Sequence, residues 1–285
     1  MIRVLCLTLC TLALAAPFAA ADDTHEDGCC PVAKKIDTLL TEWQTAQTEW
    51  NALPETDRQA IATRLGTLAQ QCPIGSRVGP TFVDLQAVLA TLVAGDEECA
   101  KHCPIAAIVE KGGPDAEACQ DAIMLKTAHT QILKNLYTLT TYATTTLGMT
   151  AKGDADLTTR VTALKTTWEK AGPEFAALAP EKQEELGKGI MELCKTNKSV
   201  ALIVPTLVAI ADGFDALIAI DAKMGEWAEA NPQFFKDMDM PAEAMEAFEA
   251  RMALVQSTSE ALHLVRDTVG EECCEEEGDT EEAGS

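Results

Sequence analysis

Cysteine is the residue type in this chain with the clearest chemical potential. The 285 residues contain eleven cysteines, of which Cys6 and Cys10 lie in an apolar N-terminal segment that we expect to be removed. The odd number that is left implies, in an exported chain, an unpaired thiol, an intermolecular disulfide or a bound metal. These nine residues are Cys29, Cys30, Cys72, Cys99, Cys103, Cys119, Cys194, Cys273 and Cys274.

Three of these cysteines and a histidine lie within one short stretch. Cys99 and Cys103 are four positions apart, so on a helix their thiols share a face and suit Cu(I) or Zn(II). Either His102 or Cys119 would complete the ligand set. An oxidising compartment favours the alternative, a disulfide that joins Cys119 to Cys99 or Cys103. The same segment is therefore a candidate metal site and a candidate disulfide site.

Two pairs of adjacent cysteines, Cys29-Cys30 and Cys273-Cys274, bracket the folded body of the chain. Adjacent cysteines do not easily bridge each other, so we expect disulfides between the two pairs. Such a bridge closes a loop of more than 200 residues, which the chain-entropy model values at roughly 5 kcal/mol at most. The rival is a clasp in which the four thiolates bind one Cu(I) or Zn(II) ion.

The sequence carries no motif of a known enzyme class, such as Gly-x-Ser-x-Gly or a phosphate loop. Glu260 and His263 have the Glu-x-x-His spacing of di-iron carboxylate bundles, but those proteins need the motif twice. His129 lies on an apolar helical stripe, which indicates a hydrogen-bonded core histidine. Asp212 and Asp215 share one face of an apolar helix, which we interpret as a solvated edge. We therefore predict no catalytic residue.

Residues 1–21 have the features of a secretory signal peptide. Arg3 supplies a positive start, an apolar stretch follows, and small residues precede Asp22. The small residues place the cleavage after Ala21. A permanent membrane anchor is the less favoured alternative, since the apolar region is shorter than the about 20 residues of a spanning helix. The mature chain is predicted to be exported to the periplasm or the extracellular space, with no membrane insertion after cleavage.

The formal charge of −23 and the pI near 4.4 restrict the class of partner. Nucleic-acid binding needs a patch of lysines and arginines, and the longest basic run is Lys34-Lys35. Half of the excess charge lies in the segments 22–31 and 271–285, which we expect to be disordered acidic tails. We therefore exclude nucleic acid as a partner.

The chain also contains an internal repeat. Trp43 and Trp168 are 125 residues apart, and the similar runs that begin at Pro80 and Pro205 have the same separation. We interpret the chain as two copies of one helical unit, in which each tryptophan faces the third helix of its own copy. The copies are residues 32–149, with a cysteine-containing insertion at 96–119, and residues 150–270.

Four helices are predicted in each copy. Apolar residues recur at spacings of three and four, and no alternating run typical of a strand occurs. Proline and glycine set the expected bounds: second helices from Pro54 and Pro180, third helices from Pro80 and Pro205, and fourth helices after Pro114 and Pro241 that end before Gly148 and Gly270. The predicted fold class is all-α, a duplicated antiparallel helical bundle of two four-helix units with disordered acidic tails.

Two classes of function agree with these features. The first is a non-catalytic binding or structural module whose cysteine-stabilised helical body presents an acidic surface to a protein partner or to cations. The alternative is a thiol-dependent periplasmic protein that holds Cu or Zn. Its ligands would be Cys99, His102, Cys103 and Cys119, or the terminal cysteine pairs. Apart from such a metal, no cofactor is expected.

Overall fold

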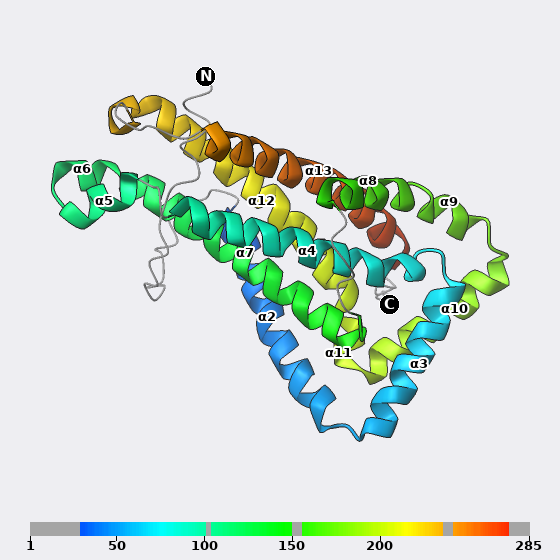
Figure 1. Ribbon diagram of the computed structural model, residues 1–285. Coiled ribbons are helices and arrows are strands. Elements are labelled where there is room, and N and C mark those ends of the chain that lie inside the picture. The colour runs from blue at the N-terminus through cyan, green and yellow to red at the C-terminus, as the bar shows by residue number, and fades with distance from the viewer. Residues whose placement is uncertain (1–28, 101–103, 150–155, 236–241, 274–285) are drawn as a thin grey trace, which may run out of the picture.

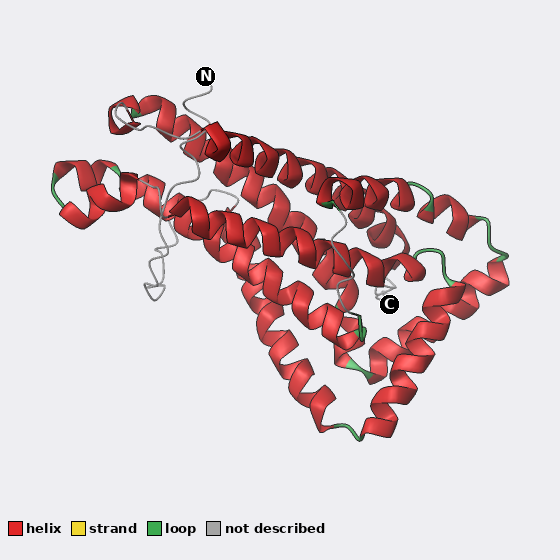
Figure 2. Cartoon of the chain, viewed as in Figure 1, coloured by secondary structure: helices red, strands yellow, loops and turns green. Residues whose placement is uncertain are grey.

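The computed structural model describes residues 29–100, 104–149, 156–235 and 242–273 (Figure 1). Within these ranges the regular structure is helical and contains no strand (Figure 2), which confirms the all-α class. The helices are α2 (Cys29–Ala52), α3 (Glu55–Gln71), α4 (Gly75–Ala100), α5 (Pro104–Lys111), α6 (Pro114–Ala118), α7 (Gln120–Thr146), α8 (Leu157–Trp168), α9 (Ala171–Ala176), α10 (Pro180–Thr196), α11 (Lys198–Ala201), α12 (Ile203–Ala230), the short 3-10 helix η2 (Pro232–Phe235) and α13 (Ala242–Cys273).

One continuous apolar core runs through the long helices. Helix α7 packs against α4, α12 and α2, while α13 packs against α12 and α8. Phe82, Leu136 and Phe214 are fully buried at these contacts. A Cβ on Gly213 would lie 2.7 Å from a methyl carbon of Leu136, so any larger residue there would force the Leu136 side chain to move. The helices that hold the polar sites described below are therefore tightly packed.

The two buried tryptophans connect the two parts of the chain. Nε1 of Trp43 on α2 donates to Oγ1 of Thr206 on α12 at 2.7 Å, and Nε1 of Trp168 on α8 donates to Oγ1 of Thr81 on α4 at 2.8 Å. Each threonine in turn donates to a carbonyl of its own helix. The prediction that each tryptophan faces the third helix of its own predicted copy is wrong, because Trp43 packs against α12 and Trp168 packs against α4.

Three helix pairings occur twice in the chain. Helix α2 contacts α7 and α12, as α8 contacts α13 and α4, and α4 contacts α7 as α12 contacts α13. The remaining pair, α3 and α10, lies apart from the main bundle (Figure 1). These pairings mean that the two parts of the chain are interleaved rather than stacked as separate bodies.

Several predicted helix bounds differ from the structure. Helix α4 begins at Gly75, so Pro80 lies inside it and cannot donate the usual hydrogen bond to a carbonyl in the preceding turn. Pro205 likewise lies in the first turn of α12 rather than at its start. Helix α7 does end before Gly148, whose φ is +64°. Helix α13 continues through Gly270 to Cys273, since the fully buried Val269 anchors its last turns.

The predicted insertion folds into a small helical cap. Helices α5 and α6 join the end of α4 to α7, and a second apolar cluster centres on the buried Ile105, Cys119 and Ala122. The rings of Trp227 and Phe234 stack with centroids 5.9 Å apart and pack against this cluster. The cap therefore fastens α5 and α6 to the end of α12.

Two helical segments, Gly75–Ala100 and Lys198–Ala230, are long and apolar enough to cross a membrane by length and composition. In the structure both contribute to the core of the bundle, where they pack against other helices of the chain. Each also carries a buried aspartate, Asp96 in one and Asp221 in the other. That no segment inserts into a membrane after cleavage stays a prediction.

Candidate functional site

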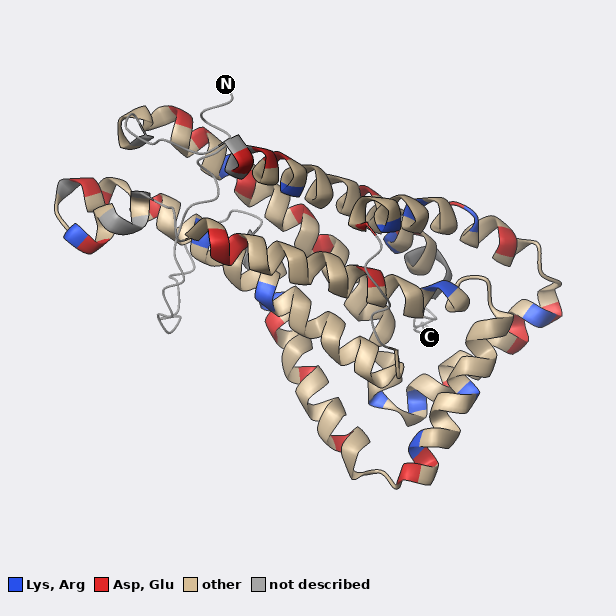
Figure 3. Cartoon of the chain, in the orientation of Figure 1, with Lys and Arg blue, Asp and Glu red and all other residues tan. Residues whose placement is uncertain are grey.

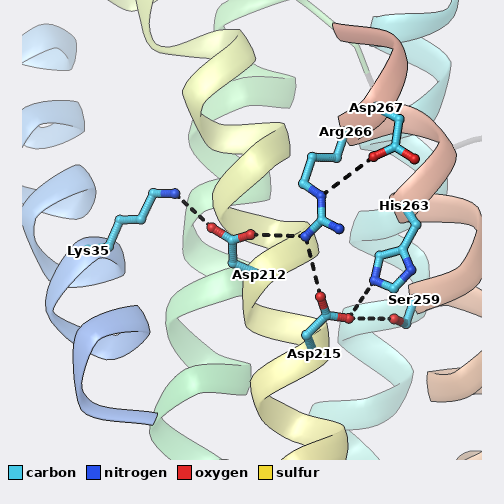
Figure 4. Close-up of polar contacts among 7 residues, drawn as sticks. All are labelled: Lys35, Asp212, Asp215, Ser259, His263, Arg266 and Asp267. Atoms are coloured by element: carbon cyan, nitrogen blue, oxygen red, sulfur yellow. Dashed lines mark hydrogen bonds and ion pairs between the residues drawn. The ribbon is translucent and has the colours of Figure 1, made fainter. Parts of the chain in front are cut away.

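A partly exposed group of polar side chains, in which Ser259 is buried, joins α2, α12 and α13 (Figure 4). Oδ1 of Asp215 accepts from Oγ of Ser259 at 2.8 Å and lies 2.7 Å from Nε2 of His263. Oδ2 of Asp212 accepts from Nζ of Lys35 at 2.7 Å. We call the set the α12–α13 array; its members are Lys35, Asp212, Asp215, Ser259, His263, Arg266 and Asp267.

The order of groups in the α12–α13 array differs from that of a nucleophilic triad. Activation of a serine requires the imidazole between the hydroxyl and the carboxylate, whereas here Asp215 lies between Ser259 and His263. Arg266 lies 3.4 Å from both Asp212 and Asp215. The two aspartates keep 24% and 40% of their side-chain surfaces exposed, so they lie at a partly solvated edge, as we expected, and there they tie α12 to α2 and α13.

The Glu-x-x-His motif does not converge on one point. Oε2 of Glu260 accepts from Nζ of Lys165 on α8 at 3.2 Å, while His263 contacts Asp215 on α12. The two side chains therefore serve different helix contacts.

A second polar group lies inside the bundle, beneath the cap. We call it the buried polar cluster; its members are Asp96 of α4, Lys126, His129 and Thr130 of α7, Asp221 of α12 and Arg251 of α13. Apart from the half-buried Thr130, every member is at most 8% exposed. Few charged side chains are buried in this way unless they are paired, so this group is the strongest departure from an apolar core.

Asp96 is the best-partnered member of the cluster. Its Oδ1 pairs with Nζ of Lys126 and lies 3.3 Å from Nη2 of Arg251, while its Oδ2 accepts from Oγ1 of Thr130 at 2.7 Å. Burial by itself would raise the pKa of Asp96, but the neighbouring cations outweigh burial and hold that pKa below its ordinary value. Asp96 is therefore the ionised centre of the cluster.

Asp221 and His129 have a different environment. Neither oxygen of Asp221 and neither ring nitrogen of His129 has a hydrogen bond, although Nε2 of His129 lies 3.4 Å from Asp221 and Nδ1 lies 3.6 Å from Asp96. Burial raises the pKa of Asp221 to about 7. Burial, followed by repulsion from Lys126, lowers the pKa of His129 well below its usual value. His129 is buried as predicted, but without the hydrogen bond that we expected.

A signal for this cluster was present in the sequence. Asp96 and Asp221 are 125 residues apart, and Lys126 and Arg251 are also 125 residues apart, as are the two tryptophans. Charged residues that recur at the repeat distance on apolar helices indicate a buried pair. The member without a counterpart is His129, since Leu254 stands at the matching position.

The structure tests one of the predicted cysteine bridges. Neither Cys99 nor Cys119 lies in a disulfide, so the bridge between these two thiols is absent, because Cys119 instead packs in the apolar cluster of the cap. Burial raises the pKa of the Cys119 thiol. His102 and Cys103 lie outside the described residues, so the metal set and the bridge from Cys103 to Cys119 stay predictions. Cys72 is buried, and its thiol is free.

The terminal cysteines lie at opposite ends of two parallel helices. Cys29 and Cys30 begin α2, and Cys273 ends α13. Lys35 and Trp43 contact Asp212 and Thr206, so α2 runs antiparallel to α12. Ser259 and Arg266 contact Asp215 and Asp212, so α13 also runs antiparallel to α12 and therefore parallel to α2. The side chains of these cysteines, and all of Cys274, lie outside the described residues. Their cross-link therefore stays a prediction, and it requires the helix ends to leave this arrangement.

One end of the molecule is strongly acidic (Figure 3). It comprises the end of α4, the cap formed by α5 and α6, the start of α7, the end of α12 and the start of α13. The described parts of residues 96–123 and 222–250 contain eleven exposed carboxylates and two lysines that are not buried, Lys111 and Lys223, while Lys134 of α7 lies 3.9 Å from one of the carboxylates, Glu97. We call this region the acidic end; its exposed carboxylates are Glu97, Glu98, Glu110, Asp115, Glu117, Asp121, Glu226, Glu229, Glu243, Glu246 and Glu249.

The other end, built from α3, α9, α10 and α11, carries balanced charge (Figure 3). Residues 49–77 and 169–201 contain nine carboxylates and eight lysines or arginines. Many of them form ion pairs: Arg64 with Glu192, Arg77 with Glu174, Lys182 with Glu185, Lys188 with Glu184 and Lys198 with Glu49. We call this region the paired end.

A shallow hollow of about 430 Å³ lies along α8 and is lined by threonines and one alanine. The hydroxyls of Thr162 and Thr166 donate to carbonyls one turn earlier in the same helix. These donors are therefore already used within α8, and the hollow adds no charged group to the candidate sites.

Comparison with known proteins gave no match: no family model, no curated protein and no solved structure is similar to this chain.

Proposed function

We propose that this chain is a non-catalytic binding module of an exported protein, and that its acidic end binds a basic surface on a protein partner. The observation that carries the proposal is the contrast between the two ends of the molecule. Eleven exposed carboxylates against two lysines lie at one end, whereas charges nearly balance at the other. Like charges that are gathered on one face attract and orient a partner of opposite charge.

The spread of these carboxylates favours a protein over a single cation. They come from α4, α5, α6, α7, α12 and α13, so they form a broad face rather than one pocket. A cation centre needs several oxygen atoms at about 2.3–2.6 Å from one point. An extended acidic face matches an extended basic surface better, because ion pairs across such an interface do not need to meet at one point.

We also propose that the body arose by duplication of one helical unit. Support comes from the two reciprocal Trp–Thr hydrogen bonds, from the helix pairings that occur twice and from the four buried charged residues at the repeat distance. An ion pair between α2 and α12, Lys35 with Asp212, also has a counterpart between α8 and α4, Arg160 with Asp84. Each copy completes the core of the other.

A binding experiment with matched variants tests the proposed function. The mature chain is titrated calorimetrically with poly-L-lysine of defined length at low and physiological salt, with Ca²⁺ in a separate arm. A triple variant at the acidic end (Glu110→Gln, Glu117→Gln, Glu226→Gln) is compared with one at the paired end (Glu55→Gln, Glu169→Gln, Glu181→Gln). Both remove three negative charges. We expect roughly tenfold weaker binding in the first and roughly unchanged binding in the second.

Equal loss of affinity in the two variants would mean that net charge alone attracts the polycation, and it would remove the proposed site. Saturable binding of Ca²⁺ that is stronger than binding of poly-lysine would replace the protein partner by a cation. Mass spectrometry of the secreted chain tests the proposed export, because cleavage after Ala21 leaves Asp22 as the first residue.

The thiol-dependent metal protein stays the alternative proposal. Among the described residues no three potential ligands lie together, so its site would depend on His102 and Cys103 beside Cys99 and Cys119. Protein purified without chelator is analysed for Cu and Zn, and its thiols are titrated under denaturation with and without reductant. Stoichiometric Cu or Zn that leaves the protein when its thiols are alkylated would support this function. Protein that holds neither metal would reject it.

A further inference from the structure

The buried polar cluster contains hydrogen-bond donors and acceptors that are not matched to each other. Nε and Nη1 of Arg251 and both carboxylate oxygens of Asp221 are buried without a hydrogen bond. Such atoms are rare in folded proteins because each one has lost its water. Arg251 is also close enough to Asp221 to lower the pKa of its carboxyl. A second pairing, between these two residues, is therefore available to the cluster.

The ion pair of Asp96 with Lys126 indicates the geometry of a pairing between Asp221 and Arg251. Asp96 and Lys126 form an ion pair, and Asp221 and Arg251 stand 125 residues after them. In the structure, however, Nη2 of Arg251 lies 3.3 Å from Asp96. Asp96 therefore has two cationic partners, whereas Asp221 has only the contact with His129.

His129 breaks the symmetry of the cluster. Its two ring nitrogens face Asp221 and Asp96 at 3.4 and 3.6 Å. A protonated Asp221 is able to donate to Nε2 while Nδ1–H points to Asp96. An ionised Asp221 instead meets the lone pair of Nε2, so it needs a cation or the other tautomer of His129.

We propose that this cluster is a proton-controlled ion-pair switch in which Arg251 changes its partner. While Asp221 holds its proton, Arg251 stays on Asp96, as the structure has it. When that proton leaves for solvent, Arg251 turns to Asp221, and Asp96 keeps Lys126 and Thr130.

The groups that face Asp221 agree with a change near neutral pH. They are Asp96 on α4, Lys126 and His129 on α7 and Arg251 on α13. Burial raises the pKa of Asp221 to about 7, although Arg251 and Lys126 oppose the rise. Loss of one proton takes the cluster from a net positive charge to neutrality, because Asp96 and Asp221 then balance Lys126 and Arg251.

Arg251 connects this switch to the acidic end. It lies on α13 close behind Glu243, Glu246 and Glu249, and the buried Phe248 holds the same stretch of helix against the bundle. A change of partner by Arg251 would shift these carboxylates relative to those of α4 and α7. The effect on binding rests on the proposed function, whereas the change of partner does not.

NMR of the mature chain tests the switch directly. The side-chain ¹⁵Nε signal of Arg251 and the ring ¹⁵N signals of His129 are followed between about pH 5.5 and about pH 8.5. We expect both to change with one shared midpoint within about one pH unit of neutrality. In Asp221→Asn, which mimics the protonated carboxyl, we expect the Arg251 signal to keep its acidic-pH position throughout. Glu260→Gln, an exposed change on α13, the helix that carries Arg251, is the matched control and should leave the midpoint unchanged.

Two results would overturn the switch. One is a wild-type chain in which neither signal moves across this pH range, a measurement that does not depend on the folding of any variant. The other is an Asp221→Asn chain that keeps the wild-type transition. Poly-lysine binding that does not vary with pH would break only the link to the acidic end, provided that the two signals still titrate.

Discussion

The acidic end and the paired end use carboxylates in different ways. At the paired end, exposed carboxylates are neutralised by lysines and arginines, and the pair Arg64–Glu192 joins α3 to α10. At the acidic end the exposed carboxylates are in large excess, and the charges that join α4, α7, α12 and α13 lie beneath them in the buried polar cluster. The difference teaches that exposed charge at the acidic end is separate from the charge that holds the helices together.

The largest effect is expected inside the acidic end. Asp96→Asn removes the carboxylate that pairs with the buried Lys126, and it leaves Asp221 as the one buried carboxylate of the cluster. Removal of one partner from a buried ion pair lowers the free energy of unfolding by about 3 to 5 kcal/mol. Urea denaturation of the mature chain measures the loss, and Asp212→Asn in the partly exposed α12–α13 array is the matched control. A loss below about 1 kcal/mol for Asp96→Asn would show that the cluster does not hold the helices together.

The next effect depends on pH. The pKa of Asp221 is raised to about 7, so the folded chain holds a proton that the unfolded chain has already lost, and stability falls as pH rises from about 4 to about 7. The lowered pKa of His129 acts oppositely, reducing stability as pH falls below about 6.5. Above about pH 6.5 the change of stability with pH therefore comes from Asp221 rather than from His129.

Asp221→Asn removes this titration without changing the shape of the side chain. We expect the variant and the wild type to be about equally stable near pH 4, and the variant to become the more stable one as pH rises, by about 4 kcal/mol at pH 8. The difference between the two denaturation curves at each pH is the measurement. A variant that is less stable than the wild type at pH 8 would show that Asp221 is well stabilised as an anion.

A smaller effect on stability is expected from exposed glutamates near helix ends, and its sign should differ between the acidic end and the paired end. Glu226 and Glu229 lie in the last turns of α12, where the helix dipole disfavours negative charge. Changing either to Gln is expected to raise stability by about 0.5 kcal/mol at low salt. Glu181 lies in the first turn of α10, so Glu181→Gln should lower stability by a similar amount. Thermal denaturation at low and high salt checks both, and a difference that survives high salt would mean that packing, not charge, causes it.

The helical class could be predicted because apolar periodicity is a local property of the chain. The partners of the helices could not be. Periodicity shows that one face of α2 and one face of α8 are buried, but it does not show against which helix. Trp43 and Trp168 illustrate this. Each was expected to face a helix of its own predicted copy, but Trp43 donates a hydrogen bond to α12 and Trp168 donates one to α4.

The buried polar cluster shows a second limit. Asp96, Lys126, Asp221 and Arg251 carry the repeat distance in the sequence, so their burial could have been inferred from it. Their actual pairing could not, because Arg251 lies on Asp96 rather than on its repeat-related partner Asp221. Which carboxylate an arginine reaches depends on how α13 crosses α4 and α12, and no local pattern records that crossing.

The smallest effect is expected at the paired end. Arg64 and Glu192 keep 49% and 64% of their side-chain surfaces exposed, so water and salt already screen their attraction. Exposed ion pairs of this kind contribute about 0–1 kcal/mol. Arg64→Gln should therefore change the free energy of unfolding by about 0.5 kcal/mol or less, and the change should disappear at high salt. Urea denaturation beside Asp96→Asn makes the comparison direct, since each variant removes one charge from an ion pair. Equal losses from the two changes would erase the distinction between the ends, because the contrast depends on burial: water replaces the lost partner of Glu192 but does not reach Lys126.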